Sequence, residues 1–320
     1  MTANETMLPL LVVRKETIAK DTVLFELQSP NGTPLAPFTA GAHIAVQVPS
    51  GAMRHYSLCS DPNRTDIYQI AVKREAEGRG GSQSLVDHVH VGNMLLTGAP
   101  SNLFNLHGAA KSFIFVAGGI GITPIRSMIY ALQAEGLRNF KLYYLTRTPQ
   151  VTAFLNELSA PELARHVVVH HTGGDPSKTF DLWSLFEKPV PGVHVYCCGS
   201  KRLMDEVKDM TGHWPSSAVH FESFGADTKP HPDDKPIEVV LDQTRLTVQV
   251  PVNKSILDTL REHNIRVPSS CESGTCGSCK VPLLEGEPDH RDLCLLPEEQ
   301  NSYIMVCVSR ARSEKLVLDL

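Results

Sequence analysis

Four cysteines near the carboxyl end of the 320-residue chain constrain its fold more than any other feature. They are Cys271, Cys276, Cys279 and Cys307. Three fall within nine residues, and the fourth follows 28 positions after the third. This spacing, C-x4-C-x2-C with a distant fourth cysteine, is typical of a loop that holds two irons and two sulfides. Gly274 and Gly277 would let the loop wrap the cluster. We expect inward-pointing backbone N–H groups to offset the negative charge of the thiolates.

Two other uses of cysteine fit the pattern less well. Structural zinc sites usually pair their ligands in two short hooks, whereas here three thiols share one loop. Disulfides are typical of secreted chains. The first apolar stretch, residues 7–13, is too short for a signal peptide and contains Pro9. No stretch is long enough to span a membrane, so we expect a cytoplasmic protein with reduced thiols. Cys294 does not continue the spacing, and we expect it to be buried as an apolar residue.

The composition indicates a globular chain with room for two or three domains. Hydrophobic residues make up 42% and charged residues 20%, which is ordinary for folded domains. The net charge of −5 argues against nucleic acid as the main partner. Residues 237–320 carry 13 acidic and 9 basic residues, which places −4 of that charge at the carboxyl end. Such an end could steer a basic docking partner, although acidic surfaces are more often only solubilising.

A proline-rich segment divides the chain. Residues 227–236 contain three prolines and mixed charges, which predicts a semi-extended linker. After it, apolar residues alternate over 237–241 (Ile237, Val239, Leu241) and again over 246–250 (Leu246, Val248, Val250), which predicts a hairpin with one buried face. We expect Asn253 to cap a helix over 254–264. With the cysteine loop, these elements predict an α+β domain of the β-grasp type over 237–320.

Two further domains are expected upstream. Residues 1–105 show short alternating runs between turn signals, which favours an antiparallel β-barrel. From residue 106 to residue 226 the pattern changes to continuous apolar runs at 113–117, 141–146, 167–171 and 194–198, with helical stretches between them. Buried strands that alternate with helices are typical of a parallel α/β sheet. The fold class is therefore multidomain.

A glycine-rich turn follows the run at 113–117. It contains Gly118, Gly119 and Gly121, and then Thr123 and Pro124 at the start of a helix expected to reach residue 134. The spacing differs from the usual GxGxxG fingerprint, and a tight strand-to-helix connection would need no ligand. Its position favours a nucleotide site, because open α/β sheets bind ligands at the carboxyl ends of their strands.

A second turn at the end of a later strand belongs to the same edge of the sheet. Cys198 and Gly199 end the run at 194–198 and precede a helix expected over 201–210. We therefore expect Cys198 to face the same crevice as the glycine-rich turn. Cys197, its neighbour, is expected to be an ordinary core residue.

The two sites above require a third. A nicotinamide releases two electrons together as hydride, whereas an iron–sulfur cluster accepts one, so a flavin is expected in residues 1–105 to mediate. Polar and glycine-rich segments at 54–57, 72–74 and 78–82 are candidates, weak singly and stronger in this order. The candidate flavin-binding residues are Arg54, His55, Tyr56, Ser57, Val72, Lys73, Arg74, Gly80, Gly81 and Ser82.

The order of these segments is similar to that of the phthalate dioxygenase reductase family. The resemblance covers essentially the whole chain. It includes Arg-x-Tyr-Ser at 54–57, Gly-Arg-Gly-Gly-Ser at 78–82, Gly-Gly-Ile-Gly-Ile-Thr-Pro at 118–124, the segment 220–225, the cysteine loop and the ending 316–320. It implies an FMN-binding barrel, an NADH-binding α/β domain and a plant-type 2Fe-2S ferredoxin domain, which passes electrons to a separate Rieske-type oxygenase.

The resemblance also implies roles for single residues. Arg54 would lie by the FMN phosphate, and Ser57 would hydrogen-bond the flavin near N5. Thr123 and Phe224 would border the flavin ring, and Cys198 would lie near the nicotinamide, so that Ser57, Thr123 and Cys198 carry the chemistry. Lys73 and residues 80–82 would hold the phosphate and the ribityl chain. One departure is Ser200, which stands where relatives commonly have proline and puts the stiffness of that turn in doubt.

Several alternatives stay open at the level of sequence. An FAD-dependent reductase that serves a non-Rieske monooxygenase would share the other two sites. Arg147 could in principle recognise the extra phosphate of NADPH, so NADH is implied by the resemblance alone. A redox-sensing protein would need neither the flavin nor the nicotinamide segment. We expect a monomer, because the cluster domain needs an exposed face for docking.

Overall fold

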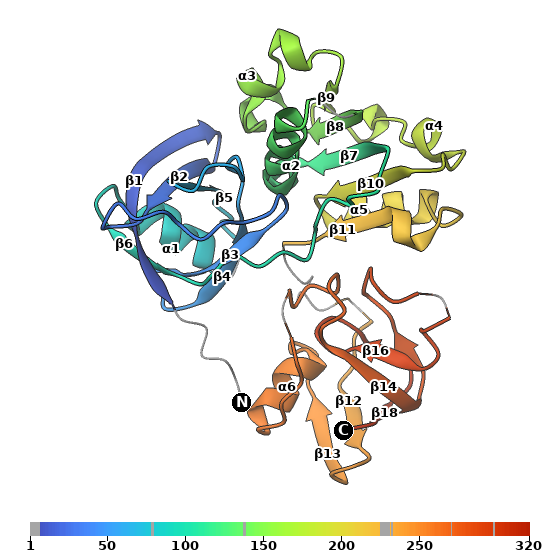
Figure 1. The fold of residues 1–320 in the computed structure, drawn as a ribbon. Coiled ribbons are helices and arrows are strands. Elements are labelled where there is room, and N and C mark those ends of the chain that lie inside the picture. The colour runs from blue at the N-terminus through green and yellow to red at the C-terminus, as the bar shows by residue number, and fades with distance from the viewer. Residues whose placement is uncertain are drawn as a thin grey trace. The chain divides into compact units, whose positions relative to one another are not determined.

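The computed structural model describes residues 7–77, 80–136, 139–224, 231, 233–269, 271–296 and 298–320. The chain divides into two compact units, Met1–Glu222 and Ser223–Leu320 (Figure 1). Each unit has hydrophobic cores of its own. Among the described residues, no helix is both long enough and apolar enough to cross a membrane.

The amino-terminal unit begins with a six-stranded antiparallel sheet, as predicted for residues 1–105. Its strand order is β4-β3-β6-β1-β2-β5, and Figure 1 shows the strands curving into a barrel with helix α1 beside them. Alternate residues such as Ile44 and Val46 point into its core. The elements are β1 (Leu8–Ala19), β2 (Thr22–Gln28), β3 (His43–Gln47), β4 (Met53–Ser57), β5 (Tyr68–Lys73), α1 (Gly81–His88) and β6 (Met94–Thr97).

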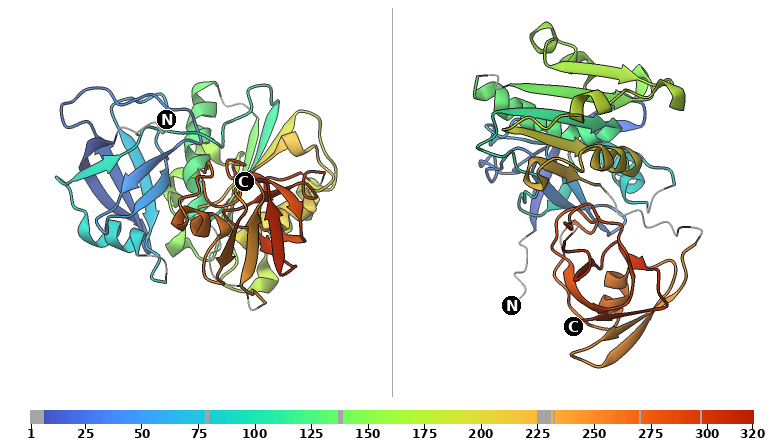
Figure 2. Two further views of the ribbon diagram at one scale, coloured as in Figure 1. Left: turned by 90° about the horizontal axis from the view of Figure 1, so that it is seen from below. Right: turned by 90° about the vertical axis from the view of Figure 1, so that its right-hand side faces the viewer.

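The same unit continues with a five-stranded parallel sheet, which confirms the predicted α/β class. Figure 2 shows its strands as one layer flanked by helices. The strands are β7 (Ser112–Gly118), β8 (Phe140–Thr146), β9 (Val167–His171), β10 (Val193–Cys198) and β11 (Val219–Glu222), and the helices are α2 (Ile122–Ala134), α3 (Leu155–Leu158), α4 (Trp183–Phe186) and α5 (Lys201–Met210). All four predicted strands and both predicted helices are present.

The order of the parallel strands defines a switch point between β7 and β10. The sheet runs β11-β10-β7-β8-β9, so the chain proceeds from β7 to β8 and β9 on one side, and then returns to β10 and β11 on the other. The connections that leave β7 and β10 therefore diverge to opposite sides. Ligands of open α/β sheets bind outside the carboxyl ends of strands at this kind of switch point.

The carboxyl-terminal unit contains a mixed sheet in the order β13-β12-β18-β14-β16. The predicted hairpin is confirmed as antiparallel β12 and β13, and β18 pairs parallel with β12, which completes a β-grasp arrangement. The elements are β12 (Ile237–Leu241), β13 (Leu246–Val250), α6 (Ile256–Glu262), β14 (Lys280–Glu285), β15 (Pro288–Asp289), β16 (Tyr303–Met305), β17 (Arg310–Ala311) and β18 (Lys315–Leu318).

Two details of the hairpin and helix differ from the prediction. Helix α6 begins after Ser255, whose hydroxyl accepts a hydrogen bond from the Asp258 N–H at 3.0 Å, so Asn253 is not its cap. Both side chains can cap a helix, and the packing of α6 on the sheet selects the later one. Leu246 is exposed, because it lies at the turn end of β13 rather than under the helix.

The predicted linker falls largely outside the described residues, since 225–230 and 232 are not among them. Its last part is described and is not a free tether. The carboxylate of Asp234 is buried and forms an ion pair with Arg291, which fixes this stretch to the carboxyl-terminal unit.

Candidate functional site

The four cysteines predicted to bind iron lie together in the carboxyl-terminal unit as two pairs. The neighbouring thiol of Cys276 has the largest effect on the pKa of Cys271, and that of Cys307 has the largest effect on the pKa of Cys279. Two thiol pairs suit two irons bridged by sulfide, each iron held by one pair. Among the described residues, no three His, Cys, Asp or Glu side chains converge on a point that would hold a single ion.

Backbone N–H groups point at the cysteine sulfurs, as the sequence predicted. Ser273 N lies 3.4 Å from Cys271 Sγ, and Ser278 N lies 3.5 Å from Cys276 Sγ. The hydrogen bond with Cys276, followed by those with Ser273 and Thr275, lowers the pKa of the Cys271 thiol. The same contact raises the pKa of the Cys276 thiol, so within this pair Cys271 more readily becomes the thiolate, the form that binds iron.

The two glycines of the loop adopt the conformations expected of them. Gly274 has φ +76° and Gly277 has φ +77°, both in the left-handed region. A Cβ at Gly274 would also lie 2.8 Å from the Val308 side chain. The loop can therefore close around a cluster only because these positions carry no side chain.

All eight cysteines are free thiols in this structure. Cys294 is half-buried, not fully buried as predicted. It lies in an irregular turn around Asp292, whose carboxylate accepts hydrogen bonds from the N–H groups of Cys294 and Leu295. This turn leaves the Cys294 thiol partly open.

The glycine-rich turn and the Cys198–Gly199 turn lie side by side at the switch point. A Cβ at Gly121 would stand 2.1 Å from the carbonyl oxygen of Cys198, and a Cβ at Gly199 would stand 3.0 Å from the Gly118 Cα. The backbones of the two turns are therefore in contact at Gly121 and Gly199, where a larger side chain would not fit. Gly119 adds a positive φ of +53°. Helix α2 starts directly after this turn, so its first N–H groups are suited to a phosphate.

The predicted reactive side chains at this switch point are buried. Thr123 donates its hydroxyl to the Ile120 carbonyl oxygen at 3.0 Å. Burial, with a smaller effect of Glu222, raises the pKa of the Cys198 thiol well above its ordinary value, so this thiol stays protonated. Cys197 is a core residue, as predicted. Ser200 caps helix α5 by accepting from Leu203 N at 3.4 Å, which stiffens the turn without proline.

A hydrogen bond joins the barrel to this switch point. Ser57, at the end of β4, donates its hydroxyl to Oε2 of Glu222 at 3.2 Å. Glu222 ends β11 and is in register with Cys198 on β10, so both lie at the carboxyl edge of the parallel sheet. We did not predict Glu222 from the sequence. Its only signal was its place in the 220–225 segment of the family resemblance.

Strand β4 divides its predicted flavin residues between two faces. Arg54 and Tyr56 pair with Val46 and Ile44, which point into the barrel core, whereas His55 packs its ring against His43 on the other face. In the described part of the chain, β4 pairs only with β3, at the end of the sheet. Its second edge can therefore present backbone groups to a ligand that lies along the strand.

The predicted phosphate-binding residues gather at the start of helix α1. A Cβ at Gly81 would stand 2.6 Å from Nε of Arg54, so this side chain lies directly against the turn. Gly80, with φ +77°, precedes the helix, and the Ser82 hydroxyl accepts from Glu75 N at 3.1 Å. Gly78 and Arg79 lie outside the described residues.

The remaining predicted residues are less free to bind. Val72 is buried in the barrel core, so only its backbone could reach a ligand. Lys73 pairs with Glu75 on the surface. Arg74 holds Asp87 with two hydrogen bonds of 2.9 and 2.8 Å, so its role stays a prediction that requires Asp87 to give way. Phe224 is exposed, and its place beside a flavin also stays a prediction.

Comparison with known families assigns a type to each part of the chain. Residues 9–105 match the oxidoreductase FAD-binding domain, residues 115–209 the oxidoreductase NAD-binding domain, and residues 239–312 the 2Fe-2S iron-sulfur cluster binding domain. The chain is therefore an oxidoreductase with flavin, nicotinamide and iron–sulfur modules.

Whole-length relatives share this organisation. The chain is 55% identical to the phthalate dioxygenase reductase of Burkholderia cepacia, over 98% of this chain and 97% of that one. It is 52% identical to the phthalate 4,5-dioxygenase oxygenase reductase subunit of Pseudomonas putida, over 97% and 96%. A solved structure of phthalate dioxygenase reductase superimposes with a TM-score of 0.76 at 55% identity, covering 98% of both chains.

A different enzyme class contains the same three modules. An intact type IV self-sufficient cytochrome P450 monooxygenase is 38% identical with a TM-score of 0.72. The likeness covers 98% of this chain but only 41% of that one.

Proposed function

Because this chain belongs to the phthalate dioxygenase reductase family, we propose that it is the NADH-dependent reductase component of a Rieske-type aromatic oxygenase, with phthalate dioxygenase as the foremost candidate. FMN and a 2Fe-2S cluster are its cofactors. When bound, the flavin accepts two electrons as hydride and releases them singly to the cluster. The chain itself supplies binding, orientation and the exclusion of water.

The hydrogen bond between Ser57 and Glu222 is the observation that carries this proposal. It brings the edge strand of the barrel to the carboxyl edge of the parallel sheet. A flavin along β4 and a nicotinamide at the glycine-rich turn would therefore meet at this pair. The Ser57 hydroxyl could turn from Glu222 to a flavin nitrogen, which would leave the Glu222 carboxylate beside the reacting atoms. The Cys198 thiol is protonated and fully buried in the core behind this edge, so only its backbone could border a ligand there.

FMN is proposed over FAD because the phosphate-binding residues cluster at one point. Arg54 lies against Gly81 at the amino terminus of α1, where N–H groups and a guanidinium suit a terminal phosphate. The matching family model is described by FAD, so the flavin must be identified directly. We assign the barrel to residues 1–105, the nicotinamide domain to 106–226, the linker to 227–236 and the cluster domain to 237–320.

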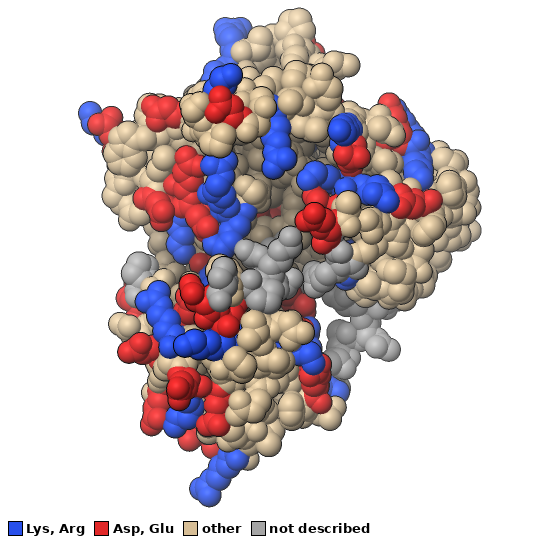
Figure 3. All heavy atoms as spheres, turned by 180° about the vertical axis from the view of Figure 1, so that it is seen from behind, with Lys and Arg blue, Asp and Glu red and all other residues tan. Residues whose placement is uncertain are grey.

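The partner is proposed to dock on the cluster domain, and the protein to act as a cytoplasmic monomer. Reduced cysteines support the compartment, because cluster assembly needs free thiols. On the face that Figure 3 shows, acidic and basic side chains are interspersed. A partner that docks on this face would be recognised by individual ion pairs and by shape complementarity more than by a large patch of one charge.

A second candidate function is electron delivery to a haem monooxygenase. It is favoured by the likeness to the self-sufficient cytochrome P450 over 98% of this chain. The two functions predict different electron acceptors and can be compared directly.

Reconstitution and single-turnover kinetics test the proposal. The full chain is purified without oxygen, its released flavin is identified by chromatography, and iron and sulfide are measured. Rapid-mixing absorbance then follows reduction by NADH and by NADPH, and transfer to a Rieske oxygenase or to a P450. FMN, two irons, a preference for NADH and faster transfer to the Rieske protein are expected. A chain that binds neither flavin nor iron would overturn the proposal, and FAD with faster P450 reduction would favour the second candidate.

A further inference from the structure

We propose that Arg126 is a positioning residue, which fixes the dinucleotide turn against the flavin-binding strand so that hydride donor and acceptor meet in one geometry. The inference rests on the proposed function, since it concerns hydride transfer at that site. It adds a residue that lies in neither predicted site.

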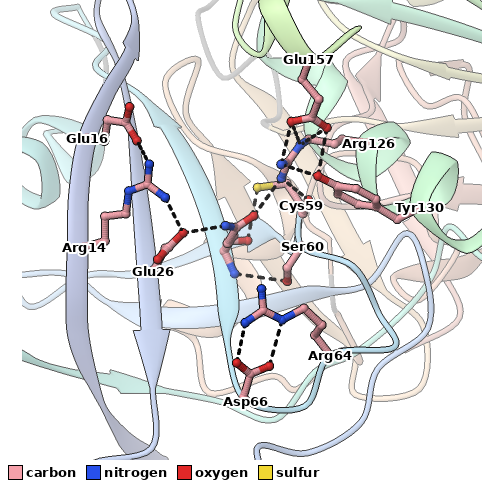
Figure 4. Close-up of polar contacts among 11 residues, drawn as sticks. Arg14, Glu16, Glu26, Cys59, Ser60, Arg64, Asp66, Arg126, Tyr130 and Glu157 are labelled. Atoms are coloured by element: carbon pink, nitrogen blue, oxygen red, sulfur yellow. Dashed lines mark hydrogen bonds and ion pairs between the residues drawn. The ribbon is translucent and has the colours of Figure 1, made fainter. Parts of the chain in front are cut away.

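Arg126 reaches from the nicotinamide domain into the barrel. It lies on α2, one helical turn after Thr123, and its side chain is buried. Its Nη1 donates to the carbonyl oxygen of Cys59 at 2.7 Å and to Oε1 of Gln69 at 2.8 Å (Figure 4). Cys59 follows Ser57 by two residues. The bond from Arg126 to Cys59 therefore joins two segments that each carry a predicted reactive residue.

The other side of the guanidinium is held within its own domain. Nε and Nη2 of Arg126 donate to the two carboxylate oxygens of Glu157 at 3.0 and 2.8 Å, and Nη2 also donates to the Tyr130 hydroxyl at 2.6 Å. The Phe154 ring lies 4.2 Å from the guanidinium carbon. All five N–H donors of Arg126 thus have acceptors, two on the barrel and the rest on the nicotinamide domain.

The barrel partners of Arg126 are themselves anchored. Gln69 donates from Nε2 to Glu26 Oε1 at 2.7 Å, and its carbonyl oxygen accepts from Cys59 N at 2.9 Å. Beside them, Ile120 of the dinucleotide turn packs on Leu24 and its apolar neighbours in the barrel. Sliding one domain against the other would leave the two N–H groups of the buried Arg126 Nη1 without their acceptors on Cys59 and Gln69, which is costly. The interface therefore has one preferred register.

This register matters for hydride transfer because reacting atoms must approach closely. A displacement of about 1 Å far from the chemistry can slow a reaction about a hundredfold. Ser57 and Thr123 each lie within three residues of the ends of the Arg126–Cys59 bond. A displacement at that bond would therefore move Ser57 through two residues of chain and Thr123 through one turn of helix α2.

Partner variants separate positioning from mere stability. Gln69→Leu removes a bond that crosses between the domains, whereas Tyr130→Phe removes a bond to the same guanidinium within one domain. Arg64→Gln is a matched control, because Arg64 pairs only with Asp66 in its own barrel loop among the contacts drawn in Figure 4. Arg126→Lys keeps the charge but loses the fork that binds several acceptors at once.

The readout is anaerobic flavin reduction in the cofactor-loaded full chain at saturating NADH. We expect Arg126→Lys to slow flavin reduction about a hundredfold and Gln69→Leu to slow it about tenfold. The Kd for NADH of Arg126→Lys should stay within about threefold of the parent value. Tyr130→Phe and Arg64→Gln should stay within about twofold of the parent rate. The primary deuterium isotope effect should rise in the slowed variants, which a loss of stability alone would not cause.

Two results would overturn the positioning role. Either Gln69→Leu reduces flavin at the parent rate, or Tyr130→Phe slows it as much as Gln69→Leu. If Arg126→Lys does not fold, the comparison of Gln69→Leu with Tyr130→Phe still decides. A parent protein that NADH does not reduce at all would contradict the proposed function itself, and so the two failures are distinguishable.

Discussion

The hydroxyl of Ser57 donates to a carboxylate oxygen of Glu222 at 3.2 Å, although 165 residues separate them in the chain. One residue ends a barrel strand and the other ends the edge strand of the parallel sheet. We propose that a flavin and a nicotinamide meet at this contact, which brings together two segments that were weak signals in the sequence.

Removing the Ser57 hydroxyl should slow hydride transfer. We expect Ser57→Ala to lower the rate of flavin reduction by NADH about a hundredfold, the usual cost of one lost donor at a reacting centre. Flavin content should remain near that of the parent, because Arg54 and the α1 turn are untouched. Rapid-mixing absorbance at the flavin band measures the rate. Glu222→Gln, which keeps an acceptor oxygen for Ser57, should slow the step less, and the reverse order would refute this assignment of roles.

Replacing one cluster ligand should separate flavin reduction by NADH from electron transfer to the oxygenase. We expect Cys276→Ser to leave NADH-driven flavin reduction nearly intact and to abolish transfer to the oxygenase, because a serine hydroxyl does not replace a thiolate on iron. The absorbance of the cluster and single-turnover reduction of the oxygenase report the two steps. Cys294→Ser serves as the control and should retain the cluster. Loss of both activities in Cys276→Ser would argue against a relay.

Three imidazoles and a phenol form a stack that should respond to acid. The rings of His107 and His194 lie 4.3 Å apart, those of His194 and His220 5.3 Å apart, and those of Tyr196 and His220 4.3 Å apart. Nδ1 of His194 is 3.0 Å from Nε2 of His220. Burial, and then the neighbouring histidines, lower the pKa of His220 to about 4, and burial also lowers that of His194.

The folded amino-terminal unit should therefore lose stability as pH falls. The pKa of His220 is lower when folded than when unfolded, so the unfolded chain binds the proton more readily between pH 6.5 and 4. We expect the free energy of unfolding to drop by about 1 kcal/mol between pH 7 and 5, after allowance for partial solvent screening. Urea unfolding at the two pH values measures it. His220→Gln should reduce the change in unfolding free energy between the two pH values. If the change is the same as in the parent, His220 is not its cause.

A methyl group at Gly121 should disturb the dinucleotide turn. Its Cβ would stand 2.1 Å from the Cys198 carbonyl oxygen, and so the two turns must separate. We expect Gly121→Ala to destabilise the amino-terminal unit by about 1–3 kcal/mol, the range for overpacking, and to weaken NADH binding. Thermal unfolding and NADH titration measure the two effects. Gly108→Ala, with no atom within 4 Å of its Cβ, is the control; equal effects in both variants would contradict the steric cause.

Local patterns were sufficient for a large part of this protein. The cysteine spacing, Gly274 and Gly277 describe one short loop, whose geometry depends on neighbours in the chain. Runs of apolar residues located the strands of the parallel sheet and indicated the antiparallel class of the barrel, because burial on one or two faces leaves a periodic trace in the sequence. Even so, the prediction of Asn253 as the helix cap was wrong, because Ser255 accepts the same kind of hydrogen bond two residues later.

The pairings that define the hydride site came only from the tertiary structure. Glu222, Arg126 and Gln69 are polar residues with no local motif, and Arg74 is occupied by Asp87 for reasons that its own segment does not reveal. Their roles depend on strand register and on how the barrel packs against the parallel sheet. The sequence by itself determined the cluster ligands and the order of the three modules, because ligand spacing and strand periodicity are local properties. The proposed meeting place of hydride donor and acceptor depends on contacts between residues more than 50 positions apart, which only the folded chain brings together.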